Sequence, residues 1–401
     1  MIEKLRGYWI LDSRGNPTIE VELRFDGKVV RASCPSGAST GTHEVVELRD
    51  NDKDFHGKGV KKAIENIKRI EKELIGKDPR NWKELDKLMI ELDGTPNLSN
   101  LGGNTITAVS IALVKAAAKI EGKKVYEYLG SKKMPALMSN IINGGKHAGN
   151  KLSIQEFMIV AKKGSIREKV KALSETYIEL KGMLKEKYGK DAINVGDEGG
   201  FAPPIDKTED ALEMISKAIE NVGYKLEIAL DSAATEFYKD GKYFIDGKHL
   251  SREELLDFYL ELSNKFNIKS IEDPFYEEDF EGFAEINKRF NGWIIGDDLL
   301  TTNPERIKMA IEKESVNGLL LKINQIGTVS KAIESFNLAK KSGWIVVVSH
   351  RSGETEDTFI ADFAVGMGSD AVKFGAPARG ERTAKYNQLL RIGDEVEGIR
   401  D

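Results

Sequence analysis

In the second half of the chain, six short apolar runs are each followed directly by charged residues. The segments are EIALD, IKSIED, WIIGDD, GLLLKIN, WIVVVSHR and DAVKF. Three that end in acids are followed by three that end in bases. If the segments are parallel strands of one barrel, these side chains meet at its carboxyl edge, where such barrels carry their functional groups. In chain order they are Asp231, Glu272 with Asp273, Asp297 with Asp298, Lys322, His350 with Arg351, and Lys373.

The acids at the first three strand ends indicate a metal site. Converging carboxylates repel one another and raise each other's pKa unless a cation neutralises them. Because side chains alternate along a strand, only one acid of each adjacent pair should point to the axis, and we choose Asp231, Glu272 and Asp297. Oxygen ligands without a Cys or His cluster favour a hard cation, and room left for water and substrate favours Mg²⁺ over Ca²⁺. The alternative is that these acids cap strand ends or pair with the bases opposite.

Lys322 directly follows three leucines, Leu319 to Leu321. A lysine beside a divalent cation and a second lysine, at the mouth of an apolar barrel, has its charged form disfavoured and can act as a neutral base. The matching task is removal of a proton next to a carboxylate, since a metal can absorb the charge that develops. The alternative is a structural ion pair between Lys322 and Asp297 or Asp298.

Several loops could complete such a site. PSGASTG (35–41) is small and rich in hydroxyls, so it can close over a ligand while Ser39 offers an oxygen to a second ion. NVGDEGGFAPP (194–204) holds Asp197 and Glu198 between glycines, which can deliver a carboxylate into a site. Each loop by itself also fits an ordinary turn. The remaining candidates are His147 in NGGKHAGN, Gln155 and Glu156 in QEFM, and Arg351 with Ser352 in SHRSGE as phosphate donors.

Composition narrows the class of protein. Lys and Arg number 60 and Asp and Glu 65, mixed along 401 residues with a formal net charge of −5, which argues against a general binder of nucleic acid or membrane surfaces. A single cysteine, Cys34, suits a reducing compartment, so we expect a cytoplasmic protein. No signal-type segment and no apolar run near the ~20 residues of a membrane helix occur. GxxxxGK[ST], GxGxxG, HExxH and CxxC are also missing, which removes most support for nucleotide-dependent and zinc-hydrolase functions.

The periodicity predicts two domains. Residues 1–130 should form an α+β domain: TIEVELRF and KVVRAS, joined by Asp26-Gly27, predict a hairpin, and helical periods follow from Val60 to Ile120. Residues 131–401 alternate short apolar segments with amphipathic stretches such as SREELLDFYLELSNKF and PERIKMAIEKE. Repeated strand-then-helix units over this length predict a (β/α) barrel.

With these motifs in order, the chain resembles the enolase family of phosphopyruvate hydratases. The resemblance runs from DSRGNPTIEVEL through PSGASTG, NGGKHAGN, QEFM, NVGDEGG, SIEDPF, LLLKINQIGT and SHRSGETEDTFIAD to GAPARGERTAKYNQLLRI, so it covers essentially the whole chain. It implies an α/β fold, an irregular (β/α)8 barrel with one antiparallel strand, capped by the smaller α+β domain. It also implies homodimers or octamers. The short C-terminus and AATEFY, in place of the common CASSEFY, depart from the family pattern without removing a catalytic group.

The resemblance further implies Mg²⁺-dependent dehydration of 2-phosphoglycerate, a small phosphorylated substrate, to phosphoenolpyruvate in glycolysis, with two Mg²⁺ per site. A lysine base combined with Mg²⁺ is the arrangement already described for this superfamily. Matched motif by motif, the metal ligands would be Asp231, Glu272, Asp297 and Ser39. Lys322 would be the base that removes the C2 proton, with Lys373 stabilising the enolate carboxylate, and Glu198, assisted by Glu156, would be the acid that protonates the C3 hydroxyl. The substrate-binding groups would be Arg351, Ser352, His147, His350 and Gln155.

Two other functions remain open from sequence. One is a related lyase or racemase acting on an unphosphorylated acid, against which SHRSGE and the serine-containing loop argue. The other is a non-catalytic binding protein that keeps the fold, which would predict loss of charged residues at the strand ends, whereas all are present here.

Overall fold

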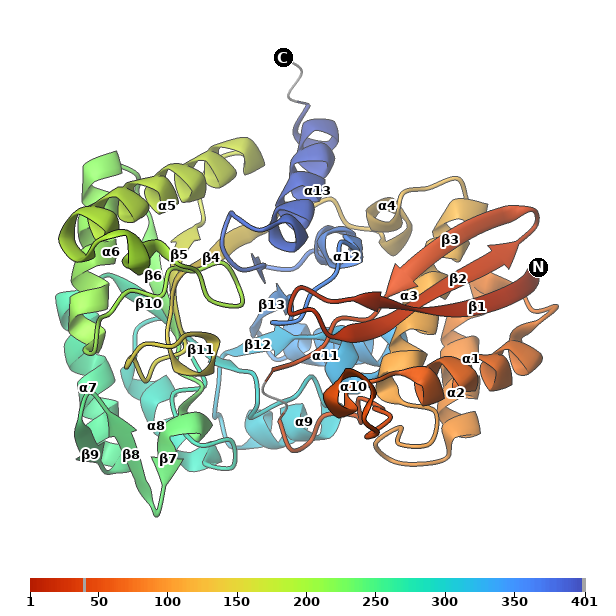
Figure 1. The fold of residues 1–401 in the computed structure, drawn as a ribbon, viewed down its shortest axis with the longest axis horizontal. Coiled ribbons are helices and arrows are strands. Elements are labelled where there is room, and N and C mark those ends of the chain that lie inside the picture. Colours follow the sequence, from red (N-terminus) through yellow and green to blue (C-terminus); the bar gives the residue numbers. More distant parts are fainter. Residues whose placement is uncertain (39–40, 399–401) are drawn as a thin grey trace.

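The computed structural model describes residues 1–38 and 41–398, and it shows a small sheet with helices beside a closed barrel (Figure 1). The small sheet is antiparallel, in the order β1 (Ile2–Leu11), β2 (Pro17–Phe25) and β3 (Lys28–Ser33). Asp26 and Gly27 both have positive φ between β2 and β3, which confirms the predicted hairpin. Four helices follow: α1 (Lys61–Leu74), α2 (Trp82–Asp93), α3 (Gly103–Ile120) and α4 (Val125–Leu129).

Helix α3 joins this unit to the barrel. It is buried along almost its whole length, packing on β2 and β3. Its hydroxyl groups also reach barrel backbone: Thr107 Oγ1 donates to Gly327 O at 3.1 Å, and Ser110 Oγ accepts from Val329 N at 2.9 Å. A helix without a polar face is stable only when it is covered on all sides, so its sequence requires the two units to pack together.

The barrel closes in the order β10-β11-β12-β13-β14-β4-β5-β6. The six apolar segments identified from sequence all become strands, β6 and β10 to β14, as predicted. The sequence patterns had not singled out β4 and β5, and β5 runs antiparallel to both of its neighbours, as the family resemblance implied. The strands are β4 (Ala136–Asn143), β5 (Glu156–Ala161), β6 (Glu227–Asp231), β10 (Ile268–Glu272), β11 (Trp293–Gly296), β12 (Gly318–Leu321), β13 (Ile345–Ser349) and β14 (Ala371–Lys373).

Helices surround the barrel, and several of them begin at capping residues. Ser165 and Ser251 each form a capping box with a glutamate three residues later, and Asn303 caps the helix that starts with Pro304. A small sheet of β7 (Tyr238–Lys239), β8 (Lys242–Ile245) and β9 (Lys248–Leu250) follows β6. The helices are α5 (Ile166–Tyr188), α6 (Thr208–Val222), α7 (Arg252–Lys265), α8 (Phe280–Arg289), α9 (Pro304–Glu312), α10 (Ile323–Ile326), α11 (Val329–Lys341), α12 (Phe359–Met367) and α13 (Gly380–Glu397).

The barrel interior has two levels. The first, which we call the apolar plug, consists of Ala136, Met138, Met158, Val160, Ala229, Ile295, Leu320, Val347 and Ala371, all buried against one another. On seven of the eight strands a plug residue stands two positions from a polar residue on the same face, and on β10 buried Ser270 takes the plug position. These polar residues, which we call the polar ring, are Asn140, Glu156, Asp231, Glu272, Asp297, Lys322, Ser349 and Lys373.

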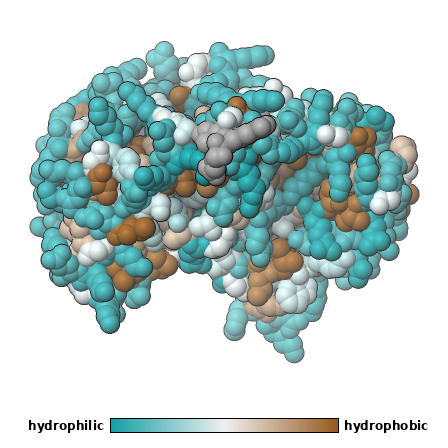
Figure 2. Space-filling view, turned by 90° about the horizontal axis from the view of Figure 1, so that it is seen from above, coloured by the Kyte–Doolittle hydropathy of each residue, from teal (hydrophilic) through white to brown (hydrophobic). Residues whose placement is uncertain are grey.

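The face of the molecule seen from above is drawn in Figure 2. The face in Figure 2 is mostly hydrophilic, and its hydrophobic residues form small separate patches. Among the described residues, no helix has both the length and the apolar character needed to cross a membrane.

Candidate active site

A small cavity of about 20 Å³ lies at the polar ring. Of the thirteen site residues predicted from sequence, eleven line it. Glu272 is completely buried and contacts Lys373, which does line the cavity, and Ser39 falls outside the described residues. The eleven are His147, Gln155, Glu156, Glu198, Asp231, Asp297, Lys322, His350, Arg351, Ser352 and Lys373.

Lys373 is the electrostatic centre of this cavity. Its Nζ lies 3.0 Å from Glu156 Oε1, 3.0 Å from Asp231 Oδ2 and 2.9 Å from Glu272 Oε1, and all four side chains are buried. Burial acts to lower the pKa of Lys373, but the surrounding carboxylates raise it well above its usual value. Three strands therefore present acids to a lysine that stays charged.

Lys322 pairs with Asp297 across neighbouring strand ends. Its Nζ contacts Asp297 Oδ2, and Gln325 Nε2 donates to Asp297 Oδ1 at 2.9 Å. Burial acts to lower the pKa of Lys322, yet attraction to Asp297 leaves it above the ordinary value. The ion pair considered from sequence is thus present, and the predicted low pKa of Lys322 requires that Asp297 first be engaged elsewhere.

Asp273 shapes the loop that carries Asp297. It adopts positive φ (42°), and its two carboxylate oxygens accept the backbone N–H groups of Asp297 (2.9 Å) and Asp298 (2.7 Å). Oxygens of these three acids lie within 4.8 Å of one another. Burial, reinforced by the charge of Asp297, raises the pKa of both Asp273 and Asp298. Such a surplus of hard oxygen donors fits a divalent cation such as Mg²⁺.

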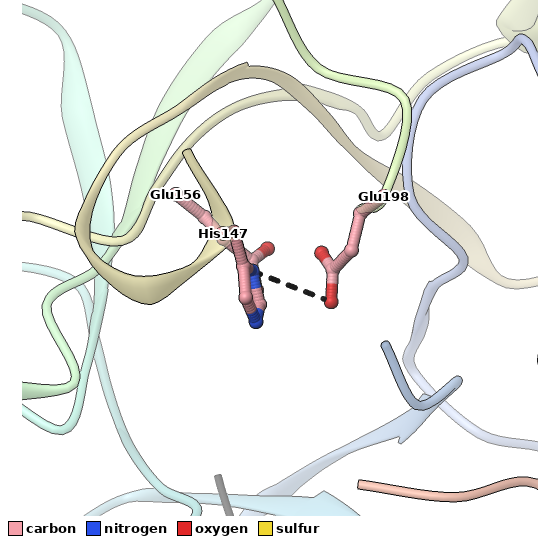
Figure 3. Close-up of side chains that lie close together, drawn as sticks. All are labelled: His147, Glu156 and Glu198. Carbon is pink, nitrogen blue, oxygen red and sulfur yellow. Dashed lines mark ion pairs between the residues drawn. The ribbon is translucent and has the colours of Figure 1, made fainter. Parts of the chain in front are cut away.

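Glu198 reaches the cavity from a glycine-flanked loop, opposite His147 and Glu156 (Figure 3). Its Oε1 lies 3.6 Å from His147 Nδ1, and its Oε2 lies 3.4 Å from His350 Nε2 and accepts from Asn140 Nδ2 at 3.2 Å. The loop needs glycine, because a Cβ on Gly196 would come within 2.3 Å of His147 O.

Glu156 and Glu198 titrate as a pair. Burial and the neighbouring negative charge of Glu198 raise the pKa of Glu156 well above its usual range. Burial raises the pKa of Glu198 as well, but attraction to His350 and His147 when these are protonated, together with the Arg382 guanidinium, lowers it well below the usual range. Of the two acids, Glu156 is therefore the one whose protonated form is favoured in this geometry.

Arg351 is the positive group on the other side of the cavity. Its Nη1 donates to Glu44 Oε2 at 2.8 Å and to Asn324 Oδ1 at 3.1 Å, and its Nη2 donates to Glu44 Oε1 at 3.1 Å. Burial acts to lower the pKa of this guanidinium, and Glu44 raises it, so it remains a fixed cation. Ser352 Oγ beside it is buried and has no protein partner among the described residues. A planar cation next to an unpartnered hydroxyl can hold a phosphate.

Four residues of the site had no assigned role from sequence. Asn140 and Gln325 contact Glu198 and Asp297, Glu44 holds Arg351, and Arg382 contacts His350. Gln325 stands three residues after Lys322 and Glu44 three after the PSGASTG loop, so proximity to a motif could have suggested them. Arg382 lies within the GAPARGERTAKYNQLLRI stretch, so a signal was present, whereas Asn140, on an unrecognised strand, carried none.

Comparisons with known proteins agree along the whole chain. The family model described as "Enolase, N-terminal domain" matches residues 2–129, and that described as "Enolase, C-terminal TIM barrel domain" matches residues 131–399. The enolase of Methanocaldococcus jannaschii is 56% identical over 395 residues, covering 96% of this chain and 93% of the relative. The enolase of Thermococcus gammatolerans is 55% identical over 405 residues (97% and 94%), and that of Pyrococcus furiosus 52% over 403 residues (97% and 94%).

Proposed function

Because this chain belongs to the enolase family, we propose that it catalyses the reversible, Mg²⁺-dependent dehydration of 2-phosphoglycerate to phosphoenolpyruvate. It is a phosphopyruvate hydratase, a carbon–oxygen lyase of glycolysis. The observation that carries the detailed mechanism is the single cavity in which a buried lysine, a buried acid pair and a cluster of carboxylates face one another.

Lys322 removes the proton from C2 of the substrate. In the free chain Asp297 keeps this lysine charged. Once Asp297 is engaged as a metal ligand, Lys322 loses that counter-ion, and burial together with the charges of Arg351 and Lys373 then acts to lower its pKa. A neutral amine at this point can accept the C2 proton.

Asp231, Glu272 and Asp297 would hold one Mg²⁺, and Ser39, outside the described residues, would contribute to a second. When bound, the ions supply positive charge for the substrate carboxylate as the C2 proton leaves. Lys373 contributes a fixed positive charge from the protein to the same oxygens. Gln155 Nε2, 3.4 Å from Asp231 Oδ2, orients that ligand and lines the substrate site.

Glu198 protonates the C3 hydroxyl, which leaves as water. The proton favoured on Glu156 is the one to be donated, so Glu156 assists Glu198 by sharing it. His147 and His350 lie on either side of Glu198 and line the closed site. Arg351 and Ser352 bind the phosphate, which fixes C2 near Lys322 and C3 near Glu198.

We also propose a division of the chain into a capping domain, residues 1–130, and a catalytic domain, residues 131–401. Gly130, with positive φ, ends α4 and supports a boundary there. Exposed Trp9 and Leu11 on β1, with Phe55 5.5 Å from Trp9 between ring centroids, support association into a homodimer or octamer. Cys34, buried and without a disulfide, supports a cytoplasmic location.

The test is ultraviolet absorbance of the purified protein with 2-phosphoglycerate and Mg²⁺, followed by addition of a chelator. We expect absorbance from the enol double bond of phosphoenolpyruvate to rise and the chelator to stop the rise. If the folded protein gives no absorbance rise with Mg²⁺ present, the proposal is contradicted. The alternative activity, that of a related lyase or racemase on an unphosphorylated acid, would then be favoured.

A further inference from the structure

Arg382, in the first turn of α13, is completely buried, and it ends at the active site. Its Nη1 donates to Arg351 O at 2.6 Å and lies 2.6 Å from His350 Nδ1. Its Nη2 donates to Ser352 O at 2.5 Å and to Asp197 O at 3.1 Å. Nε lies 3.2 Å from Glu381 Oε1. One guanidinium thus joins the phosphate-binding loop, the loop of Glu198 and one imidazole.

The contact with His350 fixes which imidazole nitrogen carries the proton. A guanidinium has only donors, so His350 Nδ1 must accept and cannot be protonated. A neutral imidazole in that state carries its hydrogen on Nε2. This nitrogen lies 3.4 Å from Glu198 Oε2, outside an aligned hydrogen bond in the substrate-free geometry.

We propose that Arg382 is a positioning residue that holds His350 as the neutral Nε2–H tautomer, directed at Glu198. The proposal rests on the proposed function and deepens it. When Glu198 gives its proton to the departing hydroxyl, a carboxylate and water form, and the Nε2–H group can donate to that carboxylate. In the reverse reaction the same imidazole, already carrying its hydrogen, does not compete for the proton returning to Glu198.

The charges around His350 favour a neutral ring. Burial lowers the pKa of His350 to about 4, and the Arg382 guanidinium from α13 acts in the same direction. Glu198 from its loop and Glu354 from the phosphate-binding loop oppose this. On the β14 side, His350 N donates to Lys373 O at 2.9 Å, and the charged group of that strand is the Lys373 ammonium.

The direct test is ¹⁵N NMR of the full-length protein labelled at its five histidines. We expect His350 in the wild type to show an unprotonated Nδ1 and a protonated Nε2 from about pH 5 to pH 8. A protonated Nδ1 in the wild type overturns the proposal without any variant being needed. Because this readout does not depend on turnover, its failure is separate from failure of the absorbance assay.

Substitution separates positioning from simple loop attachment. Arg382→Met removes the donor and the charge, so we expect His350 to populate the Nδ1–H form or to titrate above pH 5, and kcat to fall at least about tenfold, a part of the roughly 10²–10⁴-fold that acid–base catalysis supplies. Arg382→Lys keeps a donor and a charge and should retain the Nε2–H tautomer with a smaller loss of kcat.

Arg379 provides a matched control at the start of the same helix. Its Nη2 donates to Ser13 O at 2.9 Å, its Nη1 to Gly196 O at 3.2 Å and its Nε to Glu381 Oε1 at 2.9 Å, yet no contact with His350 occurs among the described residues. Arg379→Met should therefore loosen similar loops while leaving the His350 tautomer unchanged. A folded Arg382→Met protein with the wild-type tautomer, or Arg379→Met with a switched one, would overturn the proposal.

Discussion

The apolar plug and the polar ring lie on the same strands, two residues apart, and differ in almost every other respect. Leu320 on β12 and Lys322, directly after that strand, illustrate this, as do Ala371 and Lys373 on β14. Apart from Ser270 on β10, whose Oγ has no protein partner among the described residues, the level of the plug packs carbon against carbon and sulfur. Around the ring, buried polar atoms such as Glu156 Oε2 and Gln155 Oε1 have no protein partner among the described residues. Proteins tolerate buried polar atoms without hydrogen-bond partners chiefly where a bound ligand supplies the partner. We therefore assign stability to the plug and chemistry to the ring.

The reversed strand β5 shows that position along the barrel axis, and not order in the sequence, decides membership of the ring. On the other strands the ring residue follows the plug residue, as Asp231 follows Ala229. On β5 Glu156 precedes Met158, because an antiparallel strand starts at the edge where the parallel strands end. A ring acid is thus supplied by a strand start, which explains why Glu156 did not appear among the charged strand ends.

The largest effect should come from removing the ring's base. Lys322→Ala should abolish both turnover and exchange of the C2 hydrogen with solvent, with kcat falling by about 10⁴-fold or more, or roughly 5.5 kcal/mol of barrier. Glu198→Gln should also lose turnover but retain measurable exchange, because the base is intact. The measurement is deuterium exchange at C2 followed by NMR alongside the absorbance assay. Equal loss of exchange in the two variants would contradict these separate roles.

An intermediate effect, on stability instead of catalysis, should come from the plug. Leu320→Ala leaves a cavity among buried side chains, and comparable substitutions cost about 2–5 kcal/mol of unfolding free energy. Denaturant unfolding measures this, and kcat of the folded variant should stay within about tenfold of the wild type. Ile178→Ala on the exposed face of α5 is the control and should cost less than about 0.5 kcal/mol. A loss of kcat as large as that of Lys322→Ala, without destabilisation, would remove the distinction between the two levels.

Much of this comparison could be predicted from sequence, since alternation along a strand is a local property. The apolar runs predicted β6 and β10 to β14, and the residues that end them placed Asp231, Lys322 and Lys373 at one edge. Alternation also led to the choice of Glu272 over Asp273, which stays a prediction. Asp273 binds backbone N–H groups and lines the cavity, whereas Glu272 does not line it.

Other parts of the site depend on tertiary packing that no local pattern encodes. Arg382 lies in α13, and its burial becomes evident only in the fold, where loop backbone groups converge on its guanidinium. Asn140 is polar within a strand whose flanks are apolar, and without the barrel its partner Glu198, 58 residues away, is not identifiable. The protonation of the acid pair likewise follows from burial and distance, which sequence spacing does not give.

The smallest expected effect concerns a buried acid that lacks the ring's lysines. Asp86 on α2 is buried and accepts from Ser330 N at 3.0 Å, its Oδ1 has no partner, and no ion pair to it occurs among the described residues. Burial raises its pKa from 3.8 to about 6, whereas Lys373 brings the pKa of equally buried Asp231 below its usual value despite burial. Asp86 therefore shows what burial does to a carboxyl group without a cation.

The sign of the resulting pH dependence follows from the raised pKa. Below pH 3.8 Asp86 is neutral in both the folded and the unfolded chain, so it carries no penalty. Between pH 3.8 and about 6 only the unfolded chain ionises, so folding stability falls as pH rises, by up to ~3 kcal/mol for a shift of about two units, and then stays level. Asp86→Asn should thus gain unfolding free energy relative to the wild type between pH 4 and pH 7, as measured by denaturant titration. Glu91→Gln, an exposed change on the same helix, is the control. If the difference in unfolding free energy between Asp86→Asn and the wild type does not change with pH, Asp86 is ionised in the folded chain. Burial at this depth would then not by itself require a lysine partner for a carboxylate.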